Sequence, residues 1–282
     1  EGSAGSVGNV FGFAASMAPI YPVYIRDGAG NVMKDSRGML MYDFGDGKNA
    51  GMVRPNAPNA NPLRLLTLDR NITNGNAFTG TAFAEVKFLK DFKFTFNVGV
   101  GVDGRRYTSM NNMYYGQFAT NGGTLYKQHE RRFYVNLQQL LNYNRTFAGV
   151  HSVDVLLGHE SYDMNTESVS AYKTKMFSID NLELGGAVVD GQQAGSSRSE
   201  YSNEGFFLRA QYDYADRVFV SGSYRLDASS RFHKDKRWGS FWSAGAGWLI
   251  NHEPWFNAYW VDMLKLKASA GSQGNDGIPD YL

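Results

Sequence analysis

The sequence predicts an all-β chain that folds as a transmembrane, antiparallel, up-and-down β-barrel, with long loops at one rim and short turns at the other. Three observations lead to this prediction. Apolar and polar residues alternate along many segments, those segments run for about 10 residues or more, and short connections alternate with long ones. About 10 tilted residues cross a bilayer, whereas strands of soluble proteins most often have about 5–6 residues. Loop lengths that differ between the two rims are typical of outer-membrane barrels.

The composition agrees with a membrane barrel and excludes several other classes. The 282 residues carry 28 Lys and Arg against 27 Asp and Glu, so no basic surface for nucleic acid is expected. There is no cysteine, which excludes disulfides, thiolate metal sites and cysteine catalysis. Aromatic residues make up 15%, and 32 glycines stand against 7 prolines, as in a turn-rich all-β chain. The mean hydropathy of −0.40 does not argue against a membrane, because a barrel with alternating faces averages as polar.

The stretch FKFTFNVGVGVDG, residues 92–104, has two interpretations. Gly99, Gly101 and Gly104 match G-x-G-x-x-G, the turn of a dinucleotide-binding fold. The same residues also alternate as one strand, and no helical period follows them, as the nucleotide fold would require. The strand is therefore the preferred interpretation. One face is expected to meet lipid and the other the lumen: Phe92, Phe94, Phe96, Val98, Val100 and Val102 against Lys93, Thr95, Asn97, Gly99, Gly101 and Asp103.

Six further segments alternate in the same way, at residues 131–144, 152–160, 203–214, 217–227, 238–250 and 264–273. By parity, Trp242 and Trp248 are expected to face lipid. Four cations are expected on the lumen side: Arg209, Arg225, Lys265 and Lys267. They could contact a solute, but pairing with lumen-side carboxylates is the preferred interpretation, the candidates being Asp154, Glu160, Asp213 and Asp227.

The connections between these segments predict the topology. Tight turns are expected at Lys90-Asp91, Thr146–Val150 and Ala215-Asp216, and a longer connection at 228–237. Gly104–Arg131 and Asp163–Ser202 are predicted as long loops. Because short and long connections alternate strictly in this interpretation, the two long loops are expected to face outside and to carry partner or substrate contacts.

No catalytic, cofactor or metal residue is predicted, so the chain is not expected to be an enzyme. The five histidines lack the spacing of a metal site, and no G-x-S-x-G nucleophile elbow occurs. Asp27 begins DGAGN, which lacks the ligand order of a calcium loop and fits a β-turn better. The tryptophans have two interpretations, a sugar-stacking platform or an interfacial girdle, and the parity of Trp242 and Trp248 favours the girdle. All five lie in one span: Trp238, Trp242, Trp248, Trp255 and Trp260.

Four segments carry a resemblance to a known family: MAPIYPVY (17–24), RLDASSRF (225–232), RWGSFWSAGAGWLI (237–250) and LKLKASAGSQGN (264–275). In sequence, order and spacing they resemble the SusC/RagA-type TonB-dependent outer-membrane transporters of Bacteroidota. The resemblance covers nearly the whole chain. Three positions depart from it: Ala228, usually Gly in the family, Trp242, often Pro, and Ala270, commonly aromatic.

The resemblance implies that residues 1–282 lie within the β-barrel domain of a receptor of roughly 22 strands with a plugged lumen. The family's signal peptide, TonB box, plug and closing strand are not recognised, so an interior piece of the barrel is expected. The implied activity is energy-coupled import of oligosaccharides or peptides across the outer membrane of a Gram-negative bacterium. Implied partners are a SusD-like surface lipoprotein, TonB–ExbB–ExbD acting through the plug, and outer-membrane lipid, with no nucleic acid and no cofactor.

Two other functions remain open on the residues alone. One is a passive porin-like or adhesin barrel of about eight strands, whose first and last strands would pair. The other is a soluble all-β carbohydrate-binding or hydrolase domain. A hydrolase of this kind needs two carboxylates about 5–10 Å apart, and no sequence feature nominates such a pair.

Overall fold

The computed structural model describes residues 10–56, 60–116, 118–190 and 194–278. Two short α-helices precede the sheet, α1 (Val10–Ser16) and α2 (Pro62–Leu68). Four single 3-10 turns lie between strands: η1 (Ala119–Asn121), η2 (Leu184–Gly186), η3 (Lys234–Lys236) and η4 (Ile250–His252). No helix in the described ranges is long and apolar enough to cross a membrane.

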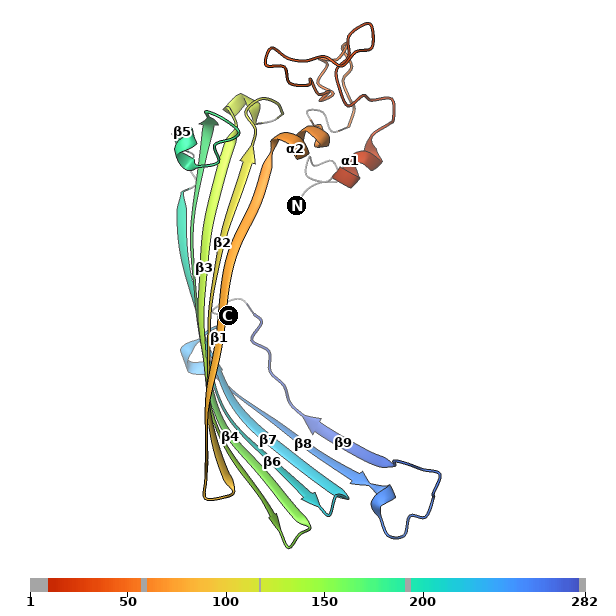
Figure 1. Ribbon diagram of the computed structural model, residues 1–282, viewed down its shortest axis with the longest axis vertical. Coiled ribbons are helices and arrows are strands. Elements are labelled where there is room, and N and C mark those ends of the chain that lie inside the picture. The colour runs from red at the N-terminus through yellow and green to blue at the C-terminus, as the bar shows by residue number, and fades with distance from the viewer. Residues whose placement is uncertain (1–9, 57–59, 117, 191–193, 279–282) are drawn as a thin grey trace. The chain divides into compact units, whose positions relative to one another are not determined.

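The described residues form nine strands in one sheet (Figure 1). The strands are β1 (Arg70–Phe88), β2 (Phe92–Asn111), β3 (Thr124–Phe147), β4 (His151–Met176), β5 (Ala187–Asp190), β6 (Gly195–Tyr214), β7 (Val218–Ser229), β8 (Trp238–Leu249) and β9 (Lys265–Gly271). Apart from β5, which pairs with β4, each strand pairs with the next one along the chain. The predicted all-β, antiparallel, up-and-down fold is confirmed. Among the described strands β1 and β9 do not pair, so the closure required by a small barrel is not found there.

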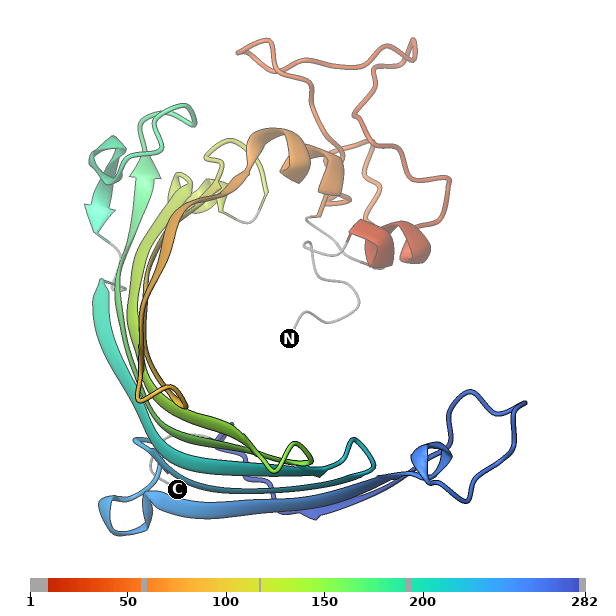
Figure 2. The same ribbon diagram turned by 60° about the horizontal axis from the view of Figure 1, so that its bottom comes forward.

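The chain packs as two compact units. The first comprises Glu1–Gly75, Arg105–Glu130 and Ser168–Ser197, and the second comprises Asn76–Gly104, Arg131–Glu167 and Arg198–Leu282. In this unit β6, β7, β8 and β9 lie side by side (Figure 2). The register pairs Tyr214 with Val218, Val218 with Trp248, and Trp248 with Leu266. Directly opposed residues of an antiparallel pair share a face, so these four side chains lie on the same face of the sheet.

The three predicted tight turns are confirmed, although the first reverses one residue earlier than the predicted Lys90-Asp91. Each hairpin reverses through two consecutive residues with positive φ: Leu89 (49°) and Lys90 (62°), Ala148 (49°) and Gly149 (71°), and Ala215 (52°) and Asp216 (55°). Two left-handed residues in succession form a type I′ turn, whose twist matches that of the flanking strands. Only Gly149 adopts this conformation without steric cost, so the other five positions carry strain that strand pairing must offset.

The two long predicted loops are shorter than the sequence indicated. β2 continues past Gly104 to Asn111 and β3 begins at Thr124, which leaves a loop of 112–123. β4 continues to Met176 and β6 begins at Gly195, which leaves 177–194 with β5 inside it. In the first unit the extended strand ends are held by a buried core that joins four segments: Met110, Leu125, Met176 and Ala187. Because this core is assembled from distant residues, no local period of two predicts the extensions.

The strict alternation of short and long connections is also wrong at one place. The connection between β8 and β9 spans 250–264, although it leaves the sheet at the same rim as the three tight turns. The predictions of strands at 238–250 and 264–273, on either side of this connection, are correct, since β8 and β9 lie within them. Their periodicity carries no information about the length or the structure of the segment between them.

The first unit also contains a small set of hairpins before the sheet. Isolated bridges join Tyr24 to Tyr42 and Arg26 to Val32, and Asp27 accepts hydrogen bonds at Oδ1 from the amides of Ala29 (3.0 Å) and Asn31 (2.8 Å). This is the β-turn predicted for DGAGN. Buried polar side chains of this unit also form hydrogen bonds with one another. For example, the Asn49 side-chain amide donates to the Asp43 carboxylate (2.6 Å).

Candidate functional site

The sheet of the second unit has two chemically different faces. The face that carries Val218, Val220 and Trp248 is called the apolar face below, and the opposite one the charged face. On the charged face Asn97 donates to Gln138 Oε1 (3.2 Å) and the Arg209 guanidinium lies 3.9 Å from Asp154. On the apolar face Phe92 packs against Tyr143 at 4.9 Å between ring centroids. The two faces therefore extend over neighbouring strands.

The structure places the predicted site residues as follows. Strand alternation from Phe92 puts Phe94, Phe96, Val98 and Val100 on the apolar face of β2, and the register with β7 puts Trp242 and Trp248 on the same face. On the charged face lie Lys93, Asn97, Arg209, Arg225, Lys265 and Lys267. Lys93 pairs with Glu85 at 3.3 Å.

The charge pairing predicted for four cations of the charged face holds for the two arginines and, within the described residues, not for Lys265 or Lys267. Arg225 contacts Asp227 (2.6 Å) and Glu160 (3.4 Å), and its guanidinium lies 5.2 Å from the centre of the Phe207 ring. Lys265 instead lies over the Phe219 ring at 4.5 Å, and no ion pair of Lys265 or Lys267 is seen among the described residues. Planar guanidinium groups suit bidentate carboxylate contacts, whereas a lysine ammonium is a single hydrated charge.

Asp276, which directly follows the resemblance segment 264–275, contacts Ser229 and Arg231 of the resemblance segment 225–232. Asp276 accepts hydrogen bonds from the hydroxyls of Tyr201 (2.6 Å) and Ser229 (3.0 Å). Arg231 donates to the Asp276 carbonyl (2.8 Å) and lies over the Tyr201 ring at 5.0 Å. The hydrogen bond from Tyr201 is the main cause that lowers the pKa of Asp276. The 274–277 segment is thus held against the ends of β6 and β7, a contact that no spacing in the sequence predicts.

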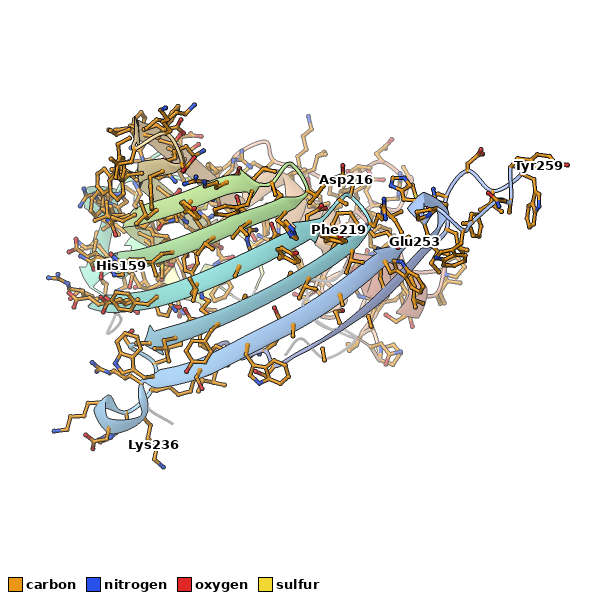
Figure 3. The ribbon with its side chains drawn as sticks, turned by 90° about the horizontal axis from the view of Figure 1, so that it is seen from below. His159, Asp216, Phe219, Lys236, Glu253 and Tyr259 are labelled. Carbon is orange, nitrogen blue, oxygen red and sulfur yellow. The ribbon has the colours of Figure 1, made fainter. Side chains whose placement is uncertain are left out.

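Two hollows lie over the charged residues of this unit. One, of about 550 Å³, is lined by Asp154, Asp213, Phe219, Lys265 and Lys267 among others. Figure 3 shows Phe219 near the beginning of β7. The second, of about 320 Å³, lies beside the Asp276 contact and includes Arg225, Asp227, Phe241 and Asn275. Both hollows combine charges of both signs with an aromatic ring, which suits a polar solute better than an apolar one.

Histidines do not gather into a metal site. His159 lies on the apolar face, where its ring nitrogens are 2.5 Å from Gln139 and 3.2 Å from Glu204 and its ring stacks on Phe206 at 4.5 Å (Figure 3). This contact explains why Gln139 interrupts an apolar face. His151 contacts the Tyr212 hydroxyl (2.7 Å). The described residues contain no group of three or more His, Cys, Asp and Glu side chains that could hold a metal ion.

Sequence reasoning missed what the strand glycines accommodate. A side chain at Gly101 would collide with the Tyr134 ring, and one at Gly158 would collide with Phe207. Each aromatic ring lies across a glycine of a neighbouring strand. The only signal in the sequence was the presence of glycines inside an alternating strand, which indicates a close approach without identifying the partner.

Long antiparallel strands with one apolar and one charged face, joined by type I′ turns, define a class: the wall of an up-and-down β-barrel of the outer-membrane type. The comparisons with known proteins identify the family. Residues 25–275 match the family model described as TonB dependent receptor-like, beta-barrel, and the chain belongs to this family.

Individual relatives agree with this assignment. The chain is 26% identical to the TonB-dependent receptor SusC of Bacteroides thetaiotaomicron over 97% of its own length and 27% of SusC. It is 26% identical to the TonB-dependent receptor P39 of Formosa agariphila over 86% of its own length and 23% of that receptor. The chain thus spans about a quarter of the curated relatives it matches. In fold it is similar to a structure of the RagAB peptide transporter, with a TM-score of 0.75, 21% identity, and coverage of 87% of this chain and 27% of that one.

Proposed function

We propose that residues 1–282 are one part of the β-barrel domain of a TonB-dependent outer-membrane importer of the SusC type. The apolar face then meets outer-membrane lipid and the charged face the lumen. The importer takes up oligosaccharides or peptides together with a SusD-like surface lipoprotein, driven by TonB–ExbB–ExbD. No catalytic step and no cofactor are assigned to this chain.

The observation that carries the proposal is the separation of the two faces over long strands of 12–26 residues, which are β1 to β4 and β6 to β8. A soluble sheet with one wet face has no need for strands of this length, whereas a barrel wall that also extends beyond the bilayer does. The similarity to SusC and to the RagAB peptide transporter supports the importer over a passive barrel, and it leaves both substrate classes in place.

The test of the proposal compares Val98→Arg with Asn97→Arg in the full-length receptor. Val98 is on the apolar face, so an arginine there places a charge near the bilayer midplane at a cost of about 2–4 kcal/mol. Asn97 faces Gln138 on the charged face, where an arginine reaches polar surroundings and should cost much less. The readout is the membrane-inserted, heat-modifiable yield. Equal damage, or a worse Asn97 variant, would contradict the assignment of lipid and lumen faces.

Transport itself is tested by growth on a glycan or peptide as sole nutrient. Import of the proposed kind requires TonB, so growth should be lost both without the receptor and without TonB. Growth that needs the receptor and persists without TonB would favour a passive barrel.

A further inference from the structure

A row of three tyrosines crosses the charged face of the second unit. Tyr134 lies on β3, Tyr162 on β4 and Tyr201 on β6, and these three strands are neighbours in the sheet. The ring centroids of Tyr134 and Tyr162 are 5.9 Å apart, and those of Tyr162 and Tyr201 are 6.0 Å apart. Neighbouring strands lie about 4.8 Å apart, so these are adjacent rings at one level of three successive strands. The three residues are called the tyrosine row below.

The tyrosine row belongs to the inner wall of the proposed barrel and not to a rim. Tyr162 has the strand parity of Glu160, a charged-face residue, and its contacts with the other two rings place the whole row on that face. Tyr134 and Tyr162 lie near the middle of β3 and β4. Under the proposed function the rings therefore face the lumen.

Both ends of the tyrosine row are fixed by contacts within the wall. The Tyr134 ring lies directly over Gly101, and its hydroxyl is 3.5 Å from that of Thr79. At the other end the Tyr201 hydroxyl donates to Asp276 (2.6 Å). Rings that are already held in place lose little conformational entropy when a ligand binds. The tyrosine row is therefore a preorganised surface.

Tyr162, the middle ring, keeps the most capacity to bind. No hydrogen bond of its hydroxyl is seen within the described ranges of the chain, whereas the Arg231 guanidinium already lies over the Tyr201 ring at 5.0 Å. A tyrosine offers a flat apolar ring together with a hydroxyl that both donates and accepts. A ligand that stacks on Tyr162 and carries hydroxyls of its own would use both.

The hollow of about 320 Å³ beside the Asp276 contact continues the tyrosine row. Its lining includes Asn203, which follows Tyr201 on the same face of β6, and the Phe241 ring. Of the charged groups that line it, Arg225 and Asp227 pair with each other at 2.6 Å. An amide, an aromatic ring and a compensated ion pair suit a neutral, polar ligand.

A pyranose ring fits these features better than a peptide does. One face of a pyranose carries mainly C–H groups and its edge carries hydroxyls, so it stacks on an aromatic ring while polar side chains bind its edge. A peptide is commonly recognised by an unpaired strand edge or by capture of its charged termini. The tyrosine row offers no strand edge, because β3, β4 and β6 each pair with a neighbour on both sides.

From this we infer that the tyrosine row and the adjoining hollow form a binding site for neutral oligosaccharides, with pyranose rings stacked on Tyr162 and its two neighbours. The inference rests on the proposed function, which makes the charged face the lumen, and it selects one of the two substrate classes left open there. Because the row crosses the strands, the site holds its ligand at one level of the wall. Trp242 and Trp248 lie on the opposite face and are not part of it.

The experiment measures initial uptake by cells that carry the full-length receptor or a variant, with cells that lack the receptor as the reference. The probes are tritium-labelled neutral oligosaccharides, prepared from plant and yeast polysaccharides, and labelled casein peptides. The readout is the KM for each probe whose uptake requires the receptor. Since KM does not depend on the number of receptors, a variant that merely folds less well lowers only the maximal rate.

Three substitutions separate the ring from the rest of the wall. Tyr162→Leu removes the flat ring and should raise the KM for the oligosaccharides about tenfold. Tyr162→Phe keeps the ring and should raise it by about threefold at most. Tyr224→Leu makes the same change on the apolar face, where Tyr224 pairs with Trp242, and should leave the KM unchanged.

The possible failures of the site and of the importer are distinguishable. An unchanged KM in Tyr162→Leu, or an equal rise in Tyr162→Phe or Tyr224→Leu, overturns stacking on Tyr162 while receptor-dependent uptake leaves the importer in place. Receptor-dependent uptake of peptides and not of neutral oligosaccharides also overturns the site and keeps the proposed function. If no probe requires the receptor, the proposed function is wrong and the site with it.

Discussion

On the charged face, glycine leaves room for an aromatic ring of the neighbouring strand to lie directly over the backbone. Gly101 lies under Tyr134, so Gly101→Ala should overpack this contact and destabilise the folded receptor by about 1–3 kcal/mol. Gly99→Ala is the matched control, because its new methyl would lie 3.7 Å from the nearest atom, Asn136 Cβ. The measurement is the free energy of unfolding in detergent. Adding Tyr134→Ala to Gly101→Ala should recover part of the lost stability. No recovery would contradict the close contact between Gly101 and the Tyr134 ring.

The ionisation of Asp35 reports on its hydrogen bond with Tyr115, which lies in the 112–123 loop. The Tyr115 hydroxyl (2.5 Å) is the main cause that lowers the pKa of Asp35, and Arg37 (2.8 Å) adds to it. A lowered carboxyl pKa contributes stability that is complete above the ordinary value of about 4 and is lost as pH falls through the lowered one. The hairpin around Asp35 should therefore resist mild acid.

Tyr115→Phe should raise the pKa of Asp35 toward the ordinary aspartate value, because it removes the strongest of these hydrogen bonds. The amides of Arg37 and Met39 donate to Asp35 Oδ1, so their NMR shifts follow its protonation as pH is lowered. Tyr114→Phe is the control, since the Tyr114 ring contacts the Arg37 guanidinium at 4.3 Å and removal of its hydroxyl leaves that contact intact. Identical titrations for both variants would contradict the role of Tyr115.

At the scale of the element, the tight turns are strained and the strands around them hold them in place. Ala215 has φ of 52°, a region that costs about 1–2 kcal/mol for a residue with a side chain and nothing for glycine. Ala215→Gly should therefore stabilise the folded receptor by roughly 1 kcal/mol in urea unfolding. Ala210→Gly, within β6, has no strain to relieve and should destabilise by about 0.5–1 kcal/mol. A loss of stability in both Ala215→Gly and Ala210→Gly would show that the turn at Ala215 is not strained.

At the scale of the whole molecule, the two rims should face opposite sides of the membrane. The 230–237 connection carries four trypsin sites, Arg231, Lys234, Lys236 and Arg237, whereas the tight turns offer Lys90 and Arg217. Trypsin added to intact cells should cut within 230–237 and spare both turns, because the rim that carries 230–237 is expected to face outside. Cleavage at Lys90 or Arg217 with an intact 230–237 would invert the topology.

The sheet order also predicts the behaviour of residues 1–282 expressed alone. Among the described strands β1 and β9 each have one neighbour, which leaves two edges of unpaired backbone groups that a bilayer does not tolerate. This piece should give no protease-resistant, heat-modifiable species in detergent. Recovery of a folded monomer would instead favour a small closed barrel.

Local patterns were sufficient to predict at least part of seven of the nine described strands, their two faces and the three tight turns, whereas β1 and β5 were not among the predicted segments. A period of two reports that one face of a strand is buried and the other is wet, and this holds for β2 without any knowledge of its neighbours. Residues 92–102 therefore identified both faces in advance, and the four motif segments identified the family. The arginine partners on the charged face could also be predicted, because opposite charges shared one parity.

What the sequence by itself determined is at least part of seven strands and which face their side chains lie on, since both follow from alternation within a few residues. Only the tertiary structure decided how far β2, β3 and β4 extend, because their ends are stabilised by Met110, Leu125, Met176 and Ala187 from distant segments. The same holds for Tyr134 over Gly101 and for Tyr201 with Asp276, which are 75 residues apart. Packing between segments distant in the chain depends on register and twist, and these leave no period in the sequence.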